Sequence, residues 1–352
     1  MTTAEERPGG TDVREAEDGG GTVDDGGAGR GTGGTTRPAW LTWTARTVAA
    51  AGLVVVLWAC LTAWGAVVHG HPAYAVLLGL TVLCSALVLW RSLRSARVRR
   101  RRVLALVLDV ALVVAGLVWL AAVAWLRPFT AVEPAPTAML SDEVVTVTES
   151  ATSVTLAPAG GADATAVFFQ PGAKVEARAY AAVLRRLAEE GHTVVIAKQP
   201  LAVAFLASGA FDAARESVPD AEQWVVGGHS LGGVVASAEA ASDAEAPDAD
   251  GAAPVVGLLL YASYPAEDLS GIPVAVYSVS ASRDGLATPA KIEASREVLP
   301  ADTRFTVLDG AVHAFFGDYG PQPGDGTPTI THAAARSAIS SVSAQFVESL
   351  GR

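Results

Sequence analysis

The sequence QWVVGGHSLGGVVA occupies residues 223–236 and places one serine, Ser230, between two pairs of glycines. Apolar residues suited to a buried strand precede the glycines, and an alanine-rich segment that favours a helix follows them. In this strand-turn-helix context, a G-x-S-x-G motif forms a sharp turn that exposes the serine hydroxyl above a sheet. Glycine is needed at Gly228 and Gly232, because side chains there would collide with the neighbouring strand and helix. We therefore expect Ser230 to be a nucleophile on a strained turn.

Strand and helix patterns alternate on both sides of this motif. We predict strands at 144–148, 152–156, 164–169, 193–198, 223–227, 255–261, 273–279 and 304–308, and helices at 176–189, 203–216, directly after the serine turn and at 331–350. Because strands and helices alternate, we expect an α/β fold over residues 141–352, with a mostly parallel sheet covered by helices on both faces.

Four motifs in this domain resemble those of α/β-hydrolases, and the domain is similar to the compact dienelactone-hydrolase branch of that superfamily. They are FFQPGA at 168–173, GGHSLGG at 227–233, SRDGLAT at 282–288 and GAVHAFFG at 310–317. Dienelactone hydrolases themselves use a cysteine nucleophile, whereas this chain has Ser230 at that position. The resemblance implies an α/β-hydrolase fold and a hydrolase that acts on acyl bonds.

His313 is the residue that we expect to act as the base for the serine. A serine hydroxyl is a weak nucleophile at neutral pH, so it needs a base and an acid that orients the base. In this fold the three residues follow the chain order serine, acid, histidine. His313 follows the strand that ends near Leu308, at the carboxyl edge of the sheet where catalytic groups converge. The other histidines of this domain lie in the turn, before a strand at the opposite edge, or at the start of the last helix: His229, His192 and His332.

Asp284 is the acid that we expect to orient His313. It lies in a glycine-containing loop after the strand 273–279, at the same edge of the sheet. Asp309 and Asp318 are closer to His313 in sequence, but topology favours Asp284. The alternative role for Asp284 is that of an ordinary Asp-Gly turn residue.

Negative charge that develops on the substrate oxygen requires two preorganised N–H donors. Leu231, directly after the nucleophile, is expected to provide one backbone N–H. The loop after the third strand is expected to provide the other, at Ala173. Pro171 and Gly172 fix this loop and let a substrate approach its backbone.

Three long apolar runs precede the domain, at about residues 48–68, 73–90 and 103–126. Each is long enough to cross a hydrocarbon core of about 30 Å at about 1.5 Å per residue. We therefore predict three transmembrane helices within residues 39–127. A cleaved signal peptide does not fit, since the first run lies far from the start and two more follow it.

Seven arginines lie between the second and third apolar runs: Arg91, Arg94, Arg97, Arg99, Arg100, Arg101 and Arg102. The positive-inside rule places this loop in the cytoplasm, and the N-terminus with it. Three crossings then put the C-terminal domain on the other side. We predict a multi-pass protein of the cell membrane with an extracytoplasmic hydrolase domain.

Three further segments have compositions that predict their structure. Residues 1–38 contain 11 glycines and 8 acidic residues against 4 arginines, and are expected to form a disordered tail. Residues 128–140 contain several prolines and are expected to be a short irregular linker. The apolar run 201–206 could line an acyl pocket, but we expect it to be helix core that faces the sheet.

The charge and cysteine content of the domain limit its partners. After Leu126 the chain carries 13 basic and 27 acidic residues, a net charge of −14. Such a domain is expected to avoid nucleic acid and anionic lipid headgroups. Cys60 and Cys84 both precede the domain, which excludes cysteine catalysis and a disulfide framework there. We expect no metal and no cofactor, and the oligomeric state stays open.

These features predict a membrane-anchored serine hydrolase that cleaves an ester or related acyl bond of a small-molecule or lipid-like substrate through an acyl-serine intermediate. Two alternatives stay open. An acyltransferase would use the same three residues, with an alcohol or sugar acceptor in place of water. A non-catalytic binding module would keep only the fold, and a lack of acylation at Ser230 would favour it.

Overall fold

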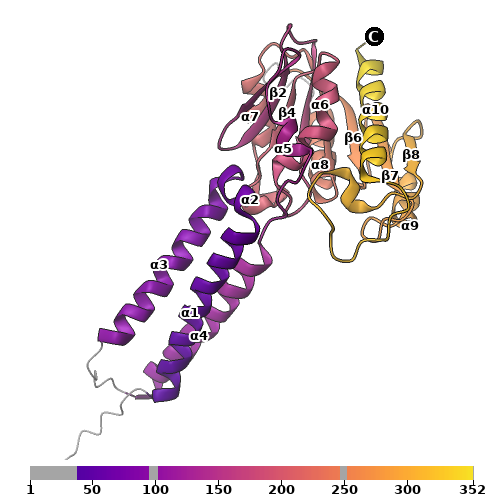
Figure 1. Ribbon diagram of the computed structural model, residues 1–352. Coiled ribbons are helices and arrows are strands. Elements are labelled where there is room, and N and C mark those ends of the chain that lie inside the picture. The colour runs from indigo at the N-terminus through magenta and orange to yellow at the C-terminus, as the bar shows by residue number, and fades with distance from the viewer. Residues whose placement is uncertain (1–37, 95–101, 246–251, 352) are drawn as a thin grey trace, which may run out of the picture.

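The computed structural model describes residues 38–94, 102–245 and 252–351, so the predicted tail and most of the arginine loop lie outside the described residues. The N-terminal part contains Ala39–Thr62 (α1), Trp64–His69 (α2), Pro72–Arg94 (α3) and Arg102–Trp125 (α4). Figure 1 shows α1, α3 and α4 projecting together from one end of the molecule. These three helices are long and apolar enough to cross a membrane, with mean hydropathies of 1.8, 2.2 and 2.7. The first begins earlier than predicted and ends at a break at Ala63, where φ is −141°.

An eight-stranded sheet forms the C-terminal part, in the order β1-β2-β4-β3-β5-β6-β7-β8. The strands are Val145–Glu149 (β1), Ser153–Pro158 (β2), Thr165–Gln170 (β3), Val194–Ala197 (β4), Gln223–His229 (β5), Val255–Tyr261 (β6), Ala275–Ala281 (β7) and Arg304–Leu308 (β8). The β1–β2 and β2–β4 pairs are antiparallel, and the other neighbouring strands are parallel. The predicted strands agree with these bounds to within two residues, and the mostly parallel sheet is confirmed.

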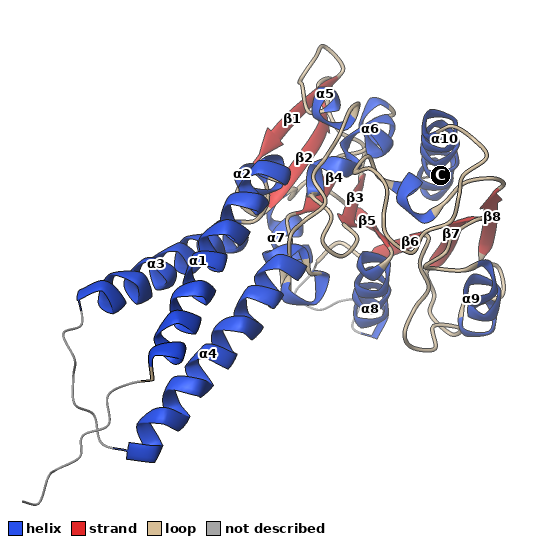
Figure 2. Cartoon of the chain, turned by 60° about the horizontal axis from the view of Figure 1, so that its bottom comes forward, coloured by secondary structure: helices blue, strands red, loops and turns tan. Residues whose placement is uncertain are grey.

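Helices cover both faces of the sheet (Figure 2). One face carries Ala181–Glu189 (α6) and His332–Leu350 (α10), and the other carries Ala210–Ser217 (α7), Leu231–Glu245 (α8) and Pro289–Ala294 (α9). The buried residues of α6 include Val183, Leu184 and Leu187, whose spacing puts them on one stripe of the helix. α10 begins after Thr331, whose hydroxyl accepts a hydrogen bond from the N–H of Ala334 and caps the helix.

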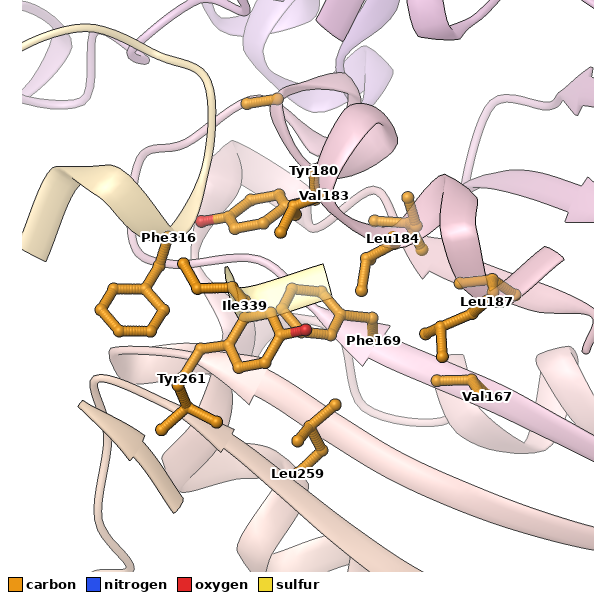
Figure 3. Close-up of a cluster of buried hydrophobic side chains, with 14 of the residues drawn as sticks. Val167, Phe169, Tyr180, Val183, Leu184, Leu187, Leu259, Tyr261, Phe316 and Ile339 are labelled. Atoms are coloured by element: carbon orange, nitrogen blue, oxygen red, sulfur yellow. The ribbon is translucent and has the colours of Figure 1, made fainter. Parts of the chain in front are cut away.

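Two apolar clusters, one on each face of the sheet, form the core of the domain. Side chains of a strand alternate between its faces. Val167 and Phe169 therefore enter the cluster beneath α6 and α10, which Figure 3 shows, while Ala166 and Phe168 enter the cluster beneath α7 and α8. Full burial of such a large apolar side chain contributes about 1.5–3 kcal/mol. Burial on both faces explains why β3 is a continuous apolar run.

The segment between α4 and the sheet is packed against the domain. Phe129 forms an isolated parallel bridge with Val175, and its N–H donates to the carbonyl of Lys174 at 2.6 Å. Ala135–Ala138 forms a short helix, α5, which contacts α6, and Ala135 is fully buried. The prediction of an irregular linker at 128–140 missed this packing, since proline content does not report tertiary contacts.

Residues 200–207 contain neither the helix core predicted at 201–206 nor the start of the helix predicted at 203–216. They contain two short 3₁₀ turns, Pro200–Ala202 (η2) and Ala204–Leu206 (η3), and α7 begins only at Ala210. Leu201 and Ala202 both have a φ of 54°, which few non-glycine residues adopt. Phe205 and Leu206 are 63% and 51% exposed. The prediction of helix core is therefore wrong, because six apolar residues are too few for periodicity to distinguish a helix from a loop.

Candidate active site

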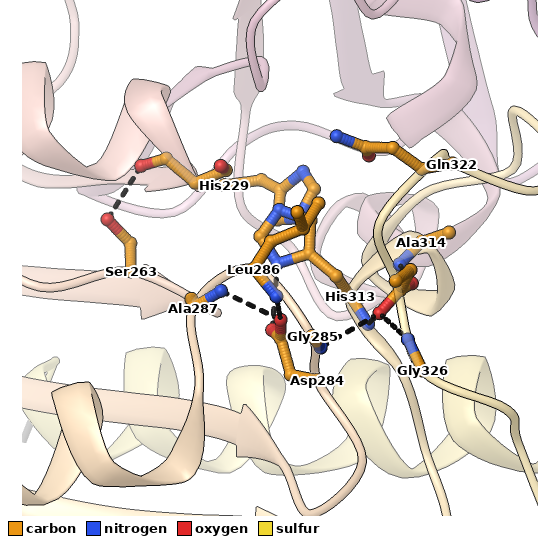
Figure 4. Close-up of polar contacts among 12 residues, drawn as sticks. His229, Ser263, Asp284, Gly285, Leu286, Ala287, His313, Ala314, Gln322 and Gly326 are labelled. Atoms are coloured by element: carbon orange, nitrogen blue, oxygen red, sulfur yellow. Dashed lines mark hydrogen bonds and ion pairs between the residues drawn. The ribbon is translucent and has the colours of Figure 1, made fainter.

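Ser230 lies on the turn between β5 and α8, at the carboxyl edge of the parallel strands. Its φ is 53°, in the left-handed region, so the turn is strained in the way that exposes a serine in a G-x-S-x-G motif. Two hydrogen bonds hold its backbone. Its N–H donates to the carbonyl of Tyr261 at 2.9 Å, and the hydroxyl of Ser263 donates to its carbonyl at 2.6 Å (Figure 4).

Gly228 and Gly232 allow the backbone to pack closely around this turn. A Cβ at Gly228 would overlap the start of α8 at Gly232 and Gly233. A Cβ at Gly232 would overlap the carbonyl oxygens of Gln170 and Pro171, at the end of β3. The start of α8 therefore lies directly against the loop that follows β3, residues 171–174, which we call the β3 loop.

Asp284 and His313 come from the loops after β7 and β8 and form a buried pair. His313 Nδ1 lies 2.7 Å from Asp284 Oδ2, with the side chains 1% and 0% exposed (Figure 4). The other oxygen, Oδ1, accepts hydrogen bonds from the N–H groups of Leu286 and Ala287 at 2.7 and 2.8 Å. Because a carboxylate only accepts hydrogen bonds, Oδ2 fixes the hydrogen of neutral His313 on Nδ1 and leaves a lone pair on Nε2.

The second ring nitrogen of His313, Nε2, is buried and has no hydrogen-bond partner among the residues that the structure describes. The carboxylate of Asp325 holds the backbone here, accepting from the N–H groups of His313 and Ala314 at 3.1 and 2.8 Å. Within the described chain, no hydrogen bond joins His313 to Ser230. Such contacts often tighten only when substrate binds. The structure thus pairs His313 with Asp284 and leaves the contact with Ser230 open.

His229, the residue before Ser230 in the turn, packs its ring against the ring of His313. The ring centres of the two histidines are 4.5 Å apart. The Tyr180 hydroxyl accepts from the N–H of Gly172 at 2.9 Å and is hydrogen-bonded to His229 Nδ1 at 2.8 Å. Burial, and then the nearby His313, hold the pKa of His229 well below its usual 6.5. His229 is therefore neutral.

The two expected oxyanion donors belong to segments that meet at the turn. Leu231 is the first residue of α8, and the first N–H groups of a helix have no acceptor inside it. In the β3 loop, the N–H groups of Gly172 and Lys174 are both engaged in hydrogen bonds. The N–H of Ala173, between them, makes no hydrogen bond to any described residue. The loop is therefore held on both sides of Ala173 while its own N–H stays available.

The other candidate acids have different partners. Asp309 Oδ1 accepts a hydrogen bond from the hydroxyl of Ser282 at 2.9 Å. Asp318 lies 2.6 Å from Arg336 and 3.4 Å from His332. Of the three acids, only Asp284 bonds to the ring of His313. In the described ranges, no group of three or more His, Cys, Asp or Glu residues could hold a metal ion.

A buried polar network that the sequence did not indicate lies next to the β3 loop. Gln170 Nε2 donates to Glu239 Oε1 at 2.9 Å, and Gln199 Nε2 donates to Gln170 Oε1 at 2.9 Å and to the carbonyl of Pro171 at 3.0 Å. Burial raises the pKa of Glu239 to about 7, although the hydrogen bond from Gln170 opposes this rise. Glu239 therefore keeps its proton in the folded protein under mildly acidic conditions.

This raised pKa predicts that stability falls as pH rises from about 4.5 to about 7 and then levels off. Over that window unfolded Glu239, with its ordinary pKa of 4.5, has lost the proton that the folded protein retains. The shift corresponds to about 3 kcal/mol of unfolding free energy at most. Glu239→Gln should remove this slope in unfolding experiments between pH 5 and 8, whereas the exposed Glu216→Gln should leave it unchanged. An unchanged slope in Glu239→Gln would contradict the assignment.

Comparison with known proteins concerns the fold of the domain. Residues 166–337 match the sequence model of the alpha/beta hydrolase family. The domain has the α/β-hydrolase fold. The family expected from the four motifs is therefore confirmed. No curated protein matches the chain.

Solved structures similar to this α/β-hydrolase domain are distant from it in sequence. A putative dienelactone hydrolase from Klebsiella pneumoniae is 14% identical with a TM-score of 0.40, over 58% of this chain and 98% of that one. A hyperthermophilic esterase from the archaeon Pyrobaculum calidifontis is 17% identical with a TM-score of 0.44, over 61% and 88%. A dienelactone hydrolase from Anabaena variabilis is 18% identical with a TM-score of 0.42, over 60% and 99%.

Proposed function

We propose that this protein is a membrane-anchored serine hydrolase that cleaves an ester or related acyl bond. The observation that carries this proposal is the buried pair of Asp284 and His313, which leaves His313 Nε2 with a lone pair beside the strained turn of Ser230. A base oriented by an acid is what a serine hydroxyl requires to act as a nucleophile.

In the first half of the reaction, Ser230 Oγ attacks the acyl carbon while His313 Nε2 takes the hydroxyl proton. The N–H groups of Leu231 and Ala173 donate to the resulting oxyanion. When the bond to the leaving oxygen breaks, His313 gives the proton to the departing alcohol and the acyl group stays on Ser230. Asp284 stabilises the imidazolium while His313 carries the proton.

In the second half, water takes the place of the alcohol. His313 Nε2 takes a proton from water, whose oxygen attacks the acyl carbon of the acyl-serine. The bond to Ser230 Oγ then breaks, the carboxylic acid leaves, and His313 returns the proton to the serine. The reaction therefore consumes one water molecule for each acyl bond and restores the enzyme.

The helices α1, α3 and α4 form the proposed anchor. In α4, none of the most apolar window is buried inside the protein, so lipid is the environment that suits its side chains. The seven arginines between the second and third spans support a cytoplasmic position for that loop and for the N-terminus. The hydrolase domain then lies outside the membrane.

Labelling with a fluorophosphonate probe tests this function. We expect one adduct on the full-length chain in detergent, measured by intact mass and mapped to Ser230. Ser230→Ala should abolish the adduct. His313→Ala should slow its formation about 10²- to 10⁴-fold, because the serine loses its base.

His332→Gln is the matched control, since His332 pairs with Asp318 and not with Asp284. It should label at the wild-type rate. A folded wild-type chain that forms no adduct would contradict the proposal. An adduct that survives Ser230→Ala would assign the reactive group to another residue.

A further inference from the structure

A loop of apolar residues borders the candidate active site. We call residues 200–207, with the sequence PLAVAFLA, the apolar loop. Its backbone is joined to the β3 loop, because the N–H of Lys174 donates to the carbonyl of Ala202 at 2.7 Å. Its second turn, η3, contacts α8, the helix that starts directly after Ser230. The apolar loop therefore adjoins both segments that carry the expected oxyanion donors.

The same loop packs on the end of the helices that adjoins the domain (Figure 1). Leu201 packs against an apolar cluster formed by Ala59 of α1, Tyr74 and Leu78 of α3, and Val123 of α4. Each of these four residues lies within about two helical turns of that end. The apolar loop is thus continuous with the interior of the proposed membrane anchor.

The β3 loop also contacts the end of the helices that adjoins the domain. Lys174 Nζ donates to the carbonyl of Trp125, the last residue of α4, at 3.2 Å and lies 4.6 Å from the centre of its ring. Tryptophan at the end of a spanning helix marks the boundary between membrane and water. Since Ala173 directly precedes Lys174, the candidate active site lies close to that boundary.

Phe205 and Leu206 are the exposed part of the apolar loop. They are adjacent and 63% and 51% exposed, although the domain that carries them is strongly acidic. Adjoining exposed apolar side chains indicate a surface that something covers. Leu201, five residues or fewer away, already packs on the proposed anchor, so a membrane around the anchor would offer them an apolar environment.

We propose that the apolar loop enters the outer leaflet and that the substrate is a long-chain acyl ester that resides in the membrane. The acyl chain would pass along Phe205 and Leu206 to bring its carbonyl to Ser230, so that its methylene groups stay in apolar surroundings. The chemistry is that of the proposed function, on which this inference rests. Water and the ester yield a fatty acid, which returns to the leaflet, and an alcohol.

Two esters distinguish a membrane-resident substrate from a water-soluble one. With the full-length chain in phosphatidylcholine vesicles, p-nitrophenyl palmitate enters the bilayer and p-nitrophenyl butyrate stays in water. Replacing both Phe205 and Leu206 by serine should lower the ratio of kcat/KM for palmitate to that for butyrate by about 10-fold or more. Val307→Ser is the matched control, since Val307 is 55% exposed on the edge strand β8. An unchanged ratio in the double variant would overturn the proposal.

A second measurement locates the loop without using catalysis. Cys60 and Cys84 are the only cysteines, so Cys60→Ser and Cys84→Ser allow one fluorophore to be attached at Phe205→Cys or at Val307→Cys. We expect nitroxide-labelled lipids to quench the fluorophore at position 205 but not at 307. No quenching at 205 would overturn the membrane contact. Quenching at 205 without any fluorophosphonate adduct would instead locate the failure in the proposed function.

Discussion

Replacing Asp284 by asparagine should lower kcat for an acyl ester about 10⁴-fold. The backbone N–H groups of Leu286 and Ala287 both donate to Asp284 Oδ1, so the asparagine oxygen has to stay at that position. Its NH₂ group then replaces Oδ2 and donates to His313 Nδ1, where the carboxylate accepted a hydrogen. The hydrogen of neutral His313 moves to Nε2, and the base for Ser230 is lost.

Steady-state turnover and the rate of fluorophosphonate labelling measure this effect, and thermal unfolding shows whether the variant is folded. Asp309→Asn is the matched control, because Asp309 bonds to Ser282 and not to His313. It should keep turnover within a few-fold of wild type. Comparable losses in Asp284→Asn and Asp309→Asn, or wild-type turnover in Asp284→Asn, would exclude the orienting role of Asp284.

Gly232→Ala should lower labelling and turnover about 100-fold or more. The added Cβ would overlap the carbonyl oxygens of Gln170 and Pro171, so the β3 loop and the start of α8 would have to separate. These two segments carry Ala173 and Leu231, and loss of one oxyanion donor typically costs about 10² to 10³ in rate. Overpacking of this kind also destabilises a protein by about 1–3 kcal/mol.

Gly160→Ala is the control for this substitution, since a Cβ at Gly160 would meet no atom within 4 Å and its φ is not positive. Its labelling rate and melting temperature should match those of wild type. For both variants, the rates of labelling and turnover are measured on protein that elutes as a single folded species. A wild-type labelling rate in Gly232→Ala would show that the β3 loop does not need its observed contact with α8.

The sheet could be predicted from the sequence because its central strands, β3 to β6, contain continuous apolar runs bounded by turn residues. Residues 128–140 and 200–207 could not be predicted in this way, because their backbone follows distant contacts. Phe129 pairs with Val175, and Leu201 packs on the ends of helices that are more than 70 residues away in the sequence. Neither contact leaves a periodic signal in the local sequence.

In the candidate site, too, some residues could be predicted from the sequence and others could not. Ser230, Asp284 and His313 follow from a local motif and from topology, because the loops after parallel strands meet at one edge of the sheet. The hydrogen bonds that support these residues join segments that are far apart in the sequence. Tyr180 bonds to a histidine 49 residues away, and Gln170 bonds to Glu239 across 69 residues. Patterns in a single sequence do not indicate such hydrogen-bonded pairs.

The packing of Phe129 and α5 has a practical consequence for producing the domain without its helices. A fragment that begins at Ser141 would lack Phe129, Ala135 and the whole of α5, and would uncover the surfaces of α6 and Val175 on which they rest. A fragment that begins near Arg127 retains them. The boundary suited to a soluble truncation therefore lies at the end of α4, and not at residue 141, where the sequence alone placed the start of the domain.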